Sequence, residues 1–162
     1  MKIFKILLVM VSIAGMQATA QELEVSKISY TDLNGIVVVD IANTITEKSL
    51  LLIVDANRML TQTLLAKLQA AKVDWKDHLI IAVVGSIPDA KSTMKSFNIA
   101  GAKWYATPGG KTAAAFKVAG TPIAVGLHAG GATAWKVMGE SQISDSNFAK
   151  IRGWLAPAPI VK

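Results

Sequence analysis

Two short runs of almost continuous apolar residues set the strongest limit on how this chain can fold. They span Ser49 to Val54 and Leu79 to Val84. A strand that is apolar at nearly every position suits a sheet covered on both faces, because successive side chains point to opposite faces. Between the two runs, apolar residues recur at helical spacing from Asn57 to Ala71, and Asn57 is available as the N-cap. The sequence therefore predicts an α/β domain in which helices cover a sheet.

Further elements continue this alternation of strand and helix. A second helical stretch opens at Ile87-Pro88-Asp89, because proline is favoured in the first turn, and it ends at Gly101. The remaining patterns predict, in chain order, a strand over 103–106, a short helix over 112–118, strands over 122–127 and 132–138 joined through Gly130-Gly131, and a closing helix from about Ser144 to Leu155 with Ser144 or Asp145 as its cap. Together they describe a mixed central sheet with helices on both faces.

An antiparallel pair of strands is predicted ahead of this domain. Segments 24–30 and 36–41 are rich in residues that favour strands, and Asn34-Gly35 between them is a strong turn signal. We expect a β-hairpin or a pair of edge strands there. The expected organisation is a signal peptide over residues 1–20, an N-terminal β extension over 21–48 and the α/β domain over 49–162.

The first twenty residues have the pattern of a secretory signal peptide. Lys2 and Lys5 supply a basic start, an apolar run follows, and Ala18-Thr19-Ala20 matches the small-x-small pattern of cleavage sites. The apolar run is about half of the ~20 residues needed to span a bilayer, which favours cleavage after Ala20 over an uncleaved anchor. The sequence therefore predicts a periplasmic or secreted protein with no membrane span after cleavage.

Composition excludes several kinds of chemistry. The chain has 162 residues and no cysteine, so it cannot form a disulfide, a zinc–thiolate site, an iron–sulfur cluster or a cysteine nucleophile. Its net charge of +6 comes with scattered lysines and no arginine cluster, which favours a solvated surface over a nucleic-acid site. The tryptophans are spread through the chain, which favours a role in packing, and they are Trp75, Trp104, Trp135 and Trp154.

One passage in the last third of the chain resembles a known family. Residues 106–111 read Ala-Thr-Pro-Gly-Gly-Lys, and an alanine-rich stretch then leads to Gly120-Thr121-Pro122 and an apolar strand. This passage and the order of the predicted elements resemble the thioredoxin-like superfamily, in particular its periplasmic TlpA and ResA-type branch. The resemblance covers about residues 49–155. It implies a thioredoxin-like sandwich that carries the N-terminal hairpin as an extension.

The resemblance also implies where a functional groove lies. In the family, a proline at the position of Pro122 follows a cis peptide bond and faces two catalytic cysteines, so we expect Thr121-Pro122 to be cis. The cysteine motif of the family corresponds here to Arg58–Thr61 or, one residue further along, to Met59–Gln62, and neither alignment supplies a thiolate. Thiol-disulfide exchange is therefore excluded, because it proceeds by thiolate attack on sulfur.

Other candidate sites are weaker than their structural alternatives. His78 and His128 are the only histidines and are not at ligand spacing from each other, so each is expected on the surface. His78 with Asp74 or Asp77 is the better metal candidate of the two. Asp55 follows a strand without a second carboxylate, which favours a role in a turn or cap. We expect neither a metal nor a cofactor, and we assign no catalytic residue.

Two hypotheses of function remain. The preferred one is a redox-inactive protein of the bacterial cell envelope that acts in protein binding, scaffolding or assembly, including a place in an export or conjugation system, with an envelope protein or an extended peptide as its partner. The alternative is a cysteine-independent enzyme or small-ligand-binding protein that uses the groove near Arg58, Thr61 and Pro122. The expected binding surface, with Thr61 at its exposed rim, consists of Arg58, Met59, Leu60, Thr61, Gln62, Gly120, Thr121 and Pro122.

Overall fold

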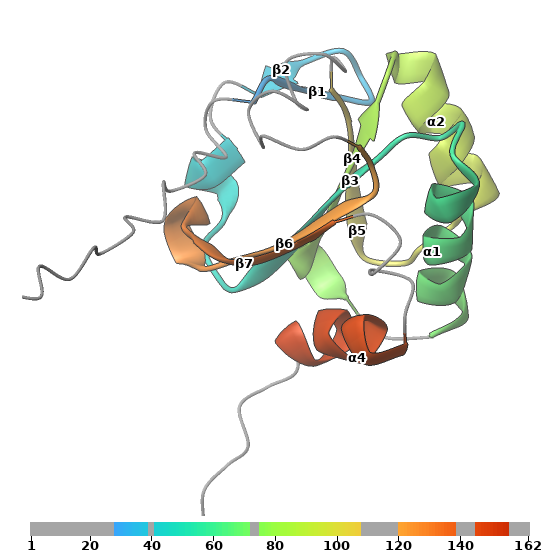
Figure 1. The fold of residues 1–162 in the computed structure, drawn as a ribbon. Helices are drawn as coiled ribbons and strands as arrows, with labels where there is room; N and C mark the ends of the chain where they lie inside the picture. The colour runs from blue at the N-terminus through green and yellow to red at the C-terminus, as the bar shows by residue number, and fades with distance from the viewer. Residues whose placement is uncertain (1–27, 39–40, 72–74, 108–119, 139–144, 156–162) are drawn as a thin grey trace, which may run out of the picture.

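The computed structural model describes residues 28–38, 41–71, 75–107, 120–138 and 145–155 (Figure 1). These residues form one sheet whose strands, in chain order, are β1 (Tyr30–Asp32), β2 (Val37–Val38), β3 (Ser49–Val54), β4 (Leu79–Val84), β5 (Ala102–Thr107), β6 (Ile123–Leu127) and β7 (Thr133–Met138). Their order across the sheet is β2-β1-β5-β4-β3-β6-β7. Strands β3, β4 and β5 are parallel, and the other neighbouring strands are antiparallel. The mixed α/β sheet predicted from the sequence is confirmed.

Strand β3 lies inside the sheet between β4 and β6, and all of its residues are buried. Leu51 stands opposite Ile80 in β4 and Val125 in β6. Because side chains alternate along a strand, Leu50 and its alternate neighbours pack on one face of the sheet while Leu51 packs on the other. This confirms that the apolar run is a strand covered on both faces.

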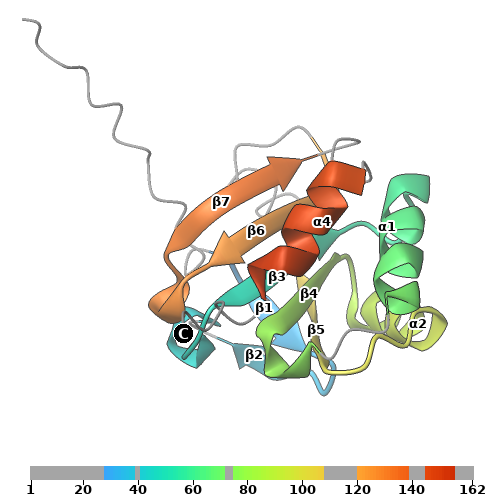
Figure 2. The ribbon, with the colours of Figure 1, turned by 90° about the horizontal axis from the view of Figure 1, so that it is seen from below.

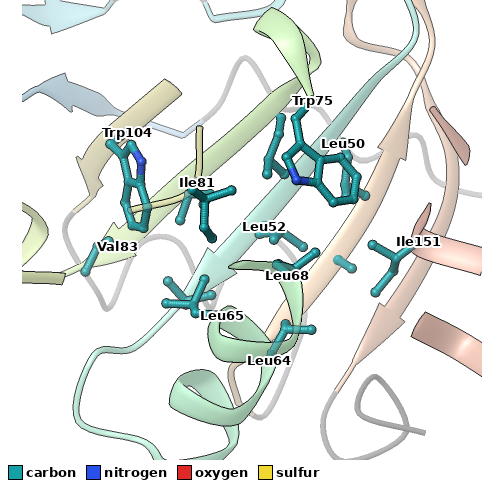
Figure 3. Packing of buried hydrophobic residues seen from close by; sticks show 14 of the residues in the cluster. Leu50, Leu52, Leu64, Leu65, Leu68, Trp75, Ile81, Val83, Trp104 and Ile151 are labelled. Carbon is teal, nitrogen blue, oxygen red and sulfur yellow. The ribbon is translucent and has the colours of Figure 1, made fainter. Parts of the chain in front are cut away.

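Three α-helices contribute to the same hydrophobic cluster on one face of the sheet: α1 (Met59–Ala70), α2 (Ile87–Ser96) and α4 (Asp145–Trp154) (Figures 1 and 2). Figure 3 shows the leucines of α1 directed toward β3, with Ile151 of α4 beside them. Trp75 and Trp104 are buried in the same cluster, which confirms that they pack. The signal peptide expected over residues 1–20 and the helix expected over 112–118 lie outside the described residues.

The N-terminal hairpin is part of the same sheet. Tyr30 of β1 pairs with Val38 of β2, and β1 also pairs with β5. Asp32 Oδ1 accepts hydrogen bonds from the N–H groups of Asn34 and Ile36 at 2.9 and 2.8 Å, and Gly35 has a φ of +92°, which favours glycine. The antiparallel pair around Asn34-Gly35 is therefore confirmed.

The chain after β2 differs from the expected strand over 36–41. Strand β2 is only two residues long, and Ile41–Thr44 forms a 3-10 helix in which Thr44 Oγ1 donates to the Ile41 carbonyl at 2.7 Å. The helical turn buries both Ile41 and Ile45 against the second face of the sheet. Burial of these two side chains explains why the chain is helical rather than extended at Ile41.

Tyr30 is the largest fully buried side chain among the described residues of this second face. It is completely buried, and its ring meets that of Tyr105 edge to face with centroids 6.0 Å apart. Its hydroxyl has no hydrogen-bond partner among the described residues. Burial raises the pKa of Tyr30 well above its ordinary value of 10.0, so the side chain stays neutral.

Helix α4 is attached to the sheet through Trp154. Its indole Nε1 donates a hydrogen bond to the carbonyl of Ser49 at 2.8 Å, and its ring meets that of Trp135 at 90° with centroids 5.7 Å apart. This packing role agrees with the expectation for the tryptophans. Of the two cap candidates, Asp145 lies in the first turn, and Ser144 lies outside the described residues.

Helix α2 begins with a capping box. The Ser86 hydroxyl accepts a hydrogen bond from the Asp89 N–H at 3.3 Å, and Asp89 Oδ2 accepts one from the Ser86 N–H at 2.8 Å. The Ser86 hydroxyl also donates to this carboxylate at 2.6 Å. These hydrogen bonds hold the pKa of Asp89 below its ordinary value of 3.8, so the carboxylate is charged at neutral pH.

We expect the variant Ser86→Ala to lower the free energy of unfolding by about 0.5 to 2 kcal/mol at neutral pH, because it removes the cap. The part due to Asp89 is present above the ordinary carboxyl pKa and should fade as the pH falls below 3.8, since the folded-state pKa is lowered. Urea denaturation at several pH values measures both effects. Ser96→Ala, near the exposed end of the same helix, is the control and should cost less than about 0.5 kcal/mol. Equal losses for the two variants would contradict the capping role.

Candidate functional site

The turn between β3 and α1 is held by Asp55. Its Oδ1 accepts a hydrogen bond from the N–H of Asn57 at 3.0 Å, and its carbonyl accepts one from the N–H of Arg58 at 3.1 Å. Asn57 is therefore used inside the turn, and the N-cap of α1 is Arg58, which makes no side-chain cap hydrogen bond. The prediction of Asn57 as the N-cap is wrong, because Asn57 lies within the turn and the helix begins only at Met59. The prediction of Asp55 as a turn residue is confirmed.

Arg58 brings this turn into contact with the loop before β6. Its Nε lies 3.7 Å from Asp55 Oδ2, and its side chain is 52% exposed. A Cβ atom added to Gly120 would lie 3.4 Å from Arg58 Nη1, so the guanidinium lies against the backbone of Gly120. The Thr121-Pro122 peptide bond that follows is cis, the isomer that the resemblance implied. The two segments placed at the groove by the resemblance therefore meet in the structure.

The other expected site residues differ in exposure. Met59 is 80% exposed and is one of the few large apolar side chains in the described residues with this much contact with solvent. Gln62 is exposed, and its Nε2 donates to the Ala56 carbonyl at 3.4 Å. Leu60 is partly buried, and Pro122 is buried. Arg58 and Met59 are therefore the exposed side chains beside the loop before β6, where Gly120 and Thr121 are half-buried, and we name these four residues the Arg58–Thr121 surface.

Thr61 does not belong to this surface. It is completely buried and lies on the same side of α1 as Leu64, Leu65 and Leu68, three, four and seven residues further along. The expectation that Thr61 occupies an exposed rim is wrong, because the helical period turns it toward the interior. Its hydroxyl has no hydrogen-bond partner among the described residues.

Thr61 instead lines a cleft between the start of α1 and α2. The cleft has a volume of about 250 Å³ and is lined by Ala56, Asn57, Thr61, Gln62, Asp89, Ser92, Thr93, Ser96 and Phe97. The share of α2 in this cleft was not predicted from the sequence. The sequence feature that could have predicted it is a polar series whose spacing places four residues on one side of a helix: Asp89, Ser92, Thr93 and Ser96.

Neither histidine belongs to the Arg58–Thr121 surface or lines the cleft between α1 and α2. His78 Nε2 is 3.6 Å from Glu47 Oε2, and His128 is exposed and meets the Trp154 ring edge to face at 5.6 Å. Of the two acids proposed beside His78, Asp74 lies outside the described residues. Within the described ranges, no three His, Asp or Glu side chains are grouped so that they could hold a metal ion. In those same ranges, no helix has the length and apolar content needed to cross a bilayer.

Comparison with known proteins gives matches among solved structures. No protein-family model and no curated protein matches the chain. The thioredoxin domain of a thiol-disulfide oxidoreductase from Bacteroides vulgatus is similar with a TM-score of 0.55 and 14% identity, over 80% of this chain and 93% of that chain. A secreted disulfide oxidoreductase of Mycobacterium tuberculosis has a TM-score of 0.54 and 14% identity, over 79% of this chain and 96% of that chain. An exposed lipoprotein thioredoxin of Streptococcus pneumoniae has a TM-score of 0.52 and 13% identity, over 77% of this chain and 97% of that chain.

At these levels of identity the likeness establishes the fold. The similarity covers nearly the whole of each solved chain, and the sequence supplies no cysteine at the turn before α1 or anywhere else. Disulfide exchange is thereby excluded for this chain on chemical grounds, whatever its solved neighbours do. The chain has a thioredoxin-like fold from which the thiol chemistry is missing.

Proposed function

We propose that this chain is a redox-inactive binding protein of the bacterial cell envelope, which holds an extended segment of another protein at the Arg58–Thr121 surface. The observation that carries the proposal is the contact between the Arg58 guanidinium and the backbone of Gly120. It joins the start of α1 to the loop before β6, so that a cationic side chain, an apolar side chain and loop backbone are presented together. Such a combination suits recognition of an extended peptide, which needs no thiol.

Exposure at this surface supports a binding role. Met59 is 80% exposed directly beside Arg58, which is half exposed. Burying a side chain of this size in an interface contributes about 1.5 to 3 kcal/mol, which is enough to dominate a small binding site. Within the described residues, no hydrogen bond involves Thr121. Its backbone N–H and carbonyl can therefore pair with an extended segment of another protein.

The envelope location rests on two observations. Residues 1–20 have the composition of a secretory signal peptide, and the solved neighbours include a secreted protein of Mycobacterium tuberculosis and an exposed lipoprotein of Streptococcus pneumoniae. Export is expected to end with cleavage after Ala20. Intact mass of protein recovered from the periplasm would measure this directly, and a product that still begins at Met1 would contradict it.

The binding proposal is tested with Met59→Asp. We expect this change to weaken binding of the partner about tenfold or more, because it places a charge at the centre of the surface, while thermal stability changes little at so exposed a position. A photoreactive amino acid at position 59 of the wild-type chain should crosslink one specific envelope protein, identified by mass spectrometry. The crosslinked partner is then purified for measurement of its affinity for each variant.

The matched control is Val37→Asp. Val37 is 59% exposed in β2, at the far edge of the sheet, and it undergoes the same change of chemistry. The proposal requires that Val37→Asp retain the partner and that Met59→Asp lose it. The reverse pattern, or crosslinks that form only from the N-terminal hairpin, would move the binding surface to β2 and refute the proposal.

A further inference from the structure

Strand β2 forms one edge of the sheet and carries exposed apolar side chains. Ile36, directly before the strand, and Val37 within it are both more than half exposed. Together with Met59 they are the exposed large apolar residues of the described chain. Single exposed apolar residues are ordinary, but a neighbouring pair on a sheet edge marks a place where another strand can add. Figure 1 shows β2 at the top of the view, beside β1.

The backbone of Val37 points away from the rest of the sheet. The Ile36 carbonyl accepts a hydrogen bond from the Asp32 N–H at 2.9 Å, so the backbone groups of Ile36 face β1. Successive residues of a strand direct these groups to opposite sides, and Val37 stands opposite Thr31 in a pair that is not hydrogen-bonded. The N–H and C=O of Val37 therefore point outward at the edge, where no described strand pairs with them.

Outward N–H and C=O groups on one residue can pair with the same residue of a second copy. Around a two-fold axis at this point, each Val37 can donate its N–H to the carbonyl of the other, as in the hydrogen-bonded pairs of an antiparallel ladder. The side chains then also meet across the axis, with Ile36 opposite Val38 of the second copy. Cross-strand pairs of β-branched residues stabilise such a ladder. The edge is therefore complementary to itself.

Charge distinguishes the two edges of the sheet. Asp32 is the one charged residue over 28–38, and its carboxylate accepts two hydrogen bonds within the turn. Strand β2 is neutral, so two copies of this basic chain can approach there without like charges meeting. The opposite edge, β7, carries the exposed Lys136, and pairing of that edge with its own copy would bring like charges close together. Self-association is therefore favoured at β2 and disfavoured at β7.

We infer that β2 pairs antiparallel with β2 of a second copy, with Val37 on the two-fold axis, and joins two sheets into one. This interface goes beyond the proposed function, because it uses none of the Arg58–Thr121 surface. The pairing strand is short, so we expect a weak dimer with a Kd between about 10 μM and 1 mM. The symmetric contact occupies the β2 edge of both copies, so association stops at the dimer.

Single introduced cysteines test the geometry, because the chain has no cysteine of its own. The Cα atoms of a hydrogen-bonded antiparallel pair lie about 5.5 Å apart, a distance that a disulfide spans. Val37→Cys should therefore form a disulfide-linked dimer under mild oxidation. Ile36→Cys is the matched control, since its two copies are offset along the strands to about 8 Å, farther than a disulfide reaches. Crosslinking of Ile36→Cys as fast as that of Val37→Cys would overturn the inferred register.

A third cysteine variant measures random collision. Met59→Cys places an exposed thiol outside the interface, and it should crosslink more slowly than Val37→Cys. Equal rates for these two variants would mean that the Val37→Cys dimer forms without a specific contact, and the inference fails.

Sedimentation equilibrium of the purified chain without its first twenty residues measures association without any added thiol. We expect a monomer–dimer equilibrium that Val37→Asp weakens about tenfold or more, because two like charges then stand opposite each other. Lys136→Gln, at the other edge, is the control and should dimerise at least as well as the wild type. A chain that stays monomeric up to about 1 mM overturns the inference, even if β2 captures another protein. Equal dimerisation of Val37→Asp and the wild type overturns it as well.

The same variants keep this interface distinct from the binding of another protein. Met59→Asp should dimerise like the wild type, and Val37→Asp should retain the protein partner while it loses the dimer. Loss of the dimer in Met59→Asp would place the contact between copies at the Arg58–Thr121 surface and refute pairing through β2.

Discussion

Replacing Trp75 by alanine is expected to lower the free energy of unfolding by about 3 to 5 kcal/mol. Trp75 is buried just before β4 and belongs to the same hydrophobic cluster as Leu50, Leu68 and Ile151 (Figure 3). These residues come from β3, α1 and α4, so the indole fills a space that several elements share. Truncation leaves a cavity there in addition to the loss of buried apolar surface. Urea denaturation of both proteins measures the difference.

A smaller change at the same position serves as the control. Trp75→Phe keeps an aromatic ring in the space and should cost clearly less than Trp75→Ala, because the residual cavity is smaller. A loss of less than about 1 kcal/mol for the alanine variant would mean that the cluster does not depend on this side chain.

A methyl group added at Gly126 is expected to cost about 1 to 3 kcal/mol through overpacking. Gly126 is buried in β6 opposite Trp135 in β7, and a Cβ atom there would overlap the indole Nε1 and Cε2 of that residue. The Trp135 ring has little freedom to move away, because it packs edge to face against Trp154 of α4. Gly126→Ala should therefore loosen the contact between α4 and the sheet, seen as a lower denaturation midpoint and a changed tryptophan fluorescence.

Gly153 offers the opposite case in the same region. A Cβ atom at Gly153 meets nothing within 4 Å, and the residue is exposed in the last turn of α4. Gly153→Ala should raise the free energy of unfolding by about 0.5 to 1 kcal/mol, because alanine favours the helix. A loss of stability in both variants would indicate that this region tolerates no added methyl group, rather than that Trp135 occupies the space beside Gly126.

Strands β3 and β4 were predictable from the sequence to the residue. Apart from Ser49, every residue of the two strands is apolar, and burial on both faces is a strong and local requirement. The end of β2 was less predictable, because Ile36 and Val37 favour strands although both are exposed. Ile41 begins a 3-10 helix that packs onto the sheet, and that contact involves residues from β3 and β6. Local preference could not predict a contact made across the fold.

At the candidate site, too, local sequence patterns could not predict the contacts between segments that are distant in the sequence. The meeting of Arg58 with Gly120 was expected from the family resemblance, since the two residues are far apart in the sequence and no local pattern joins them. The burial of Thr61 was missed, because a threonine in the first turn of a helix is ordinarily exposed. What buries it is the helical period, which places Thr61 on the same side of α1 as Leu64, Leu65 and Leu68. The spacing of these residues in the sequence would have indicated this burial.

The central place of β3 in the sheet has a consequence for synthesis of the chain. Strand β3 is complete at Val54, but its neighbour β4 ends at Val84 and its other neighbour β6 ends only at Leu127 of the 162 residues. One hydrogen-bonding edge of β3 therefore stays open until most of the chain has left the ribosome. Pairing between such distant segments is also slow, because a long loop must close first. During that interval the nascent chain exposes apolar strands to chaperones, which extends the time in which it can be captured before it folds.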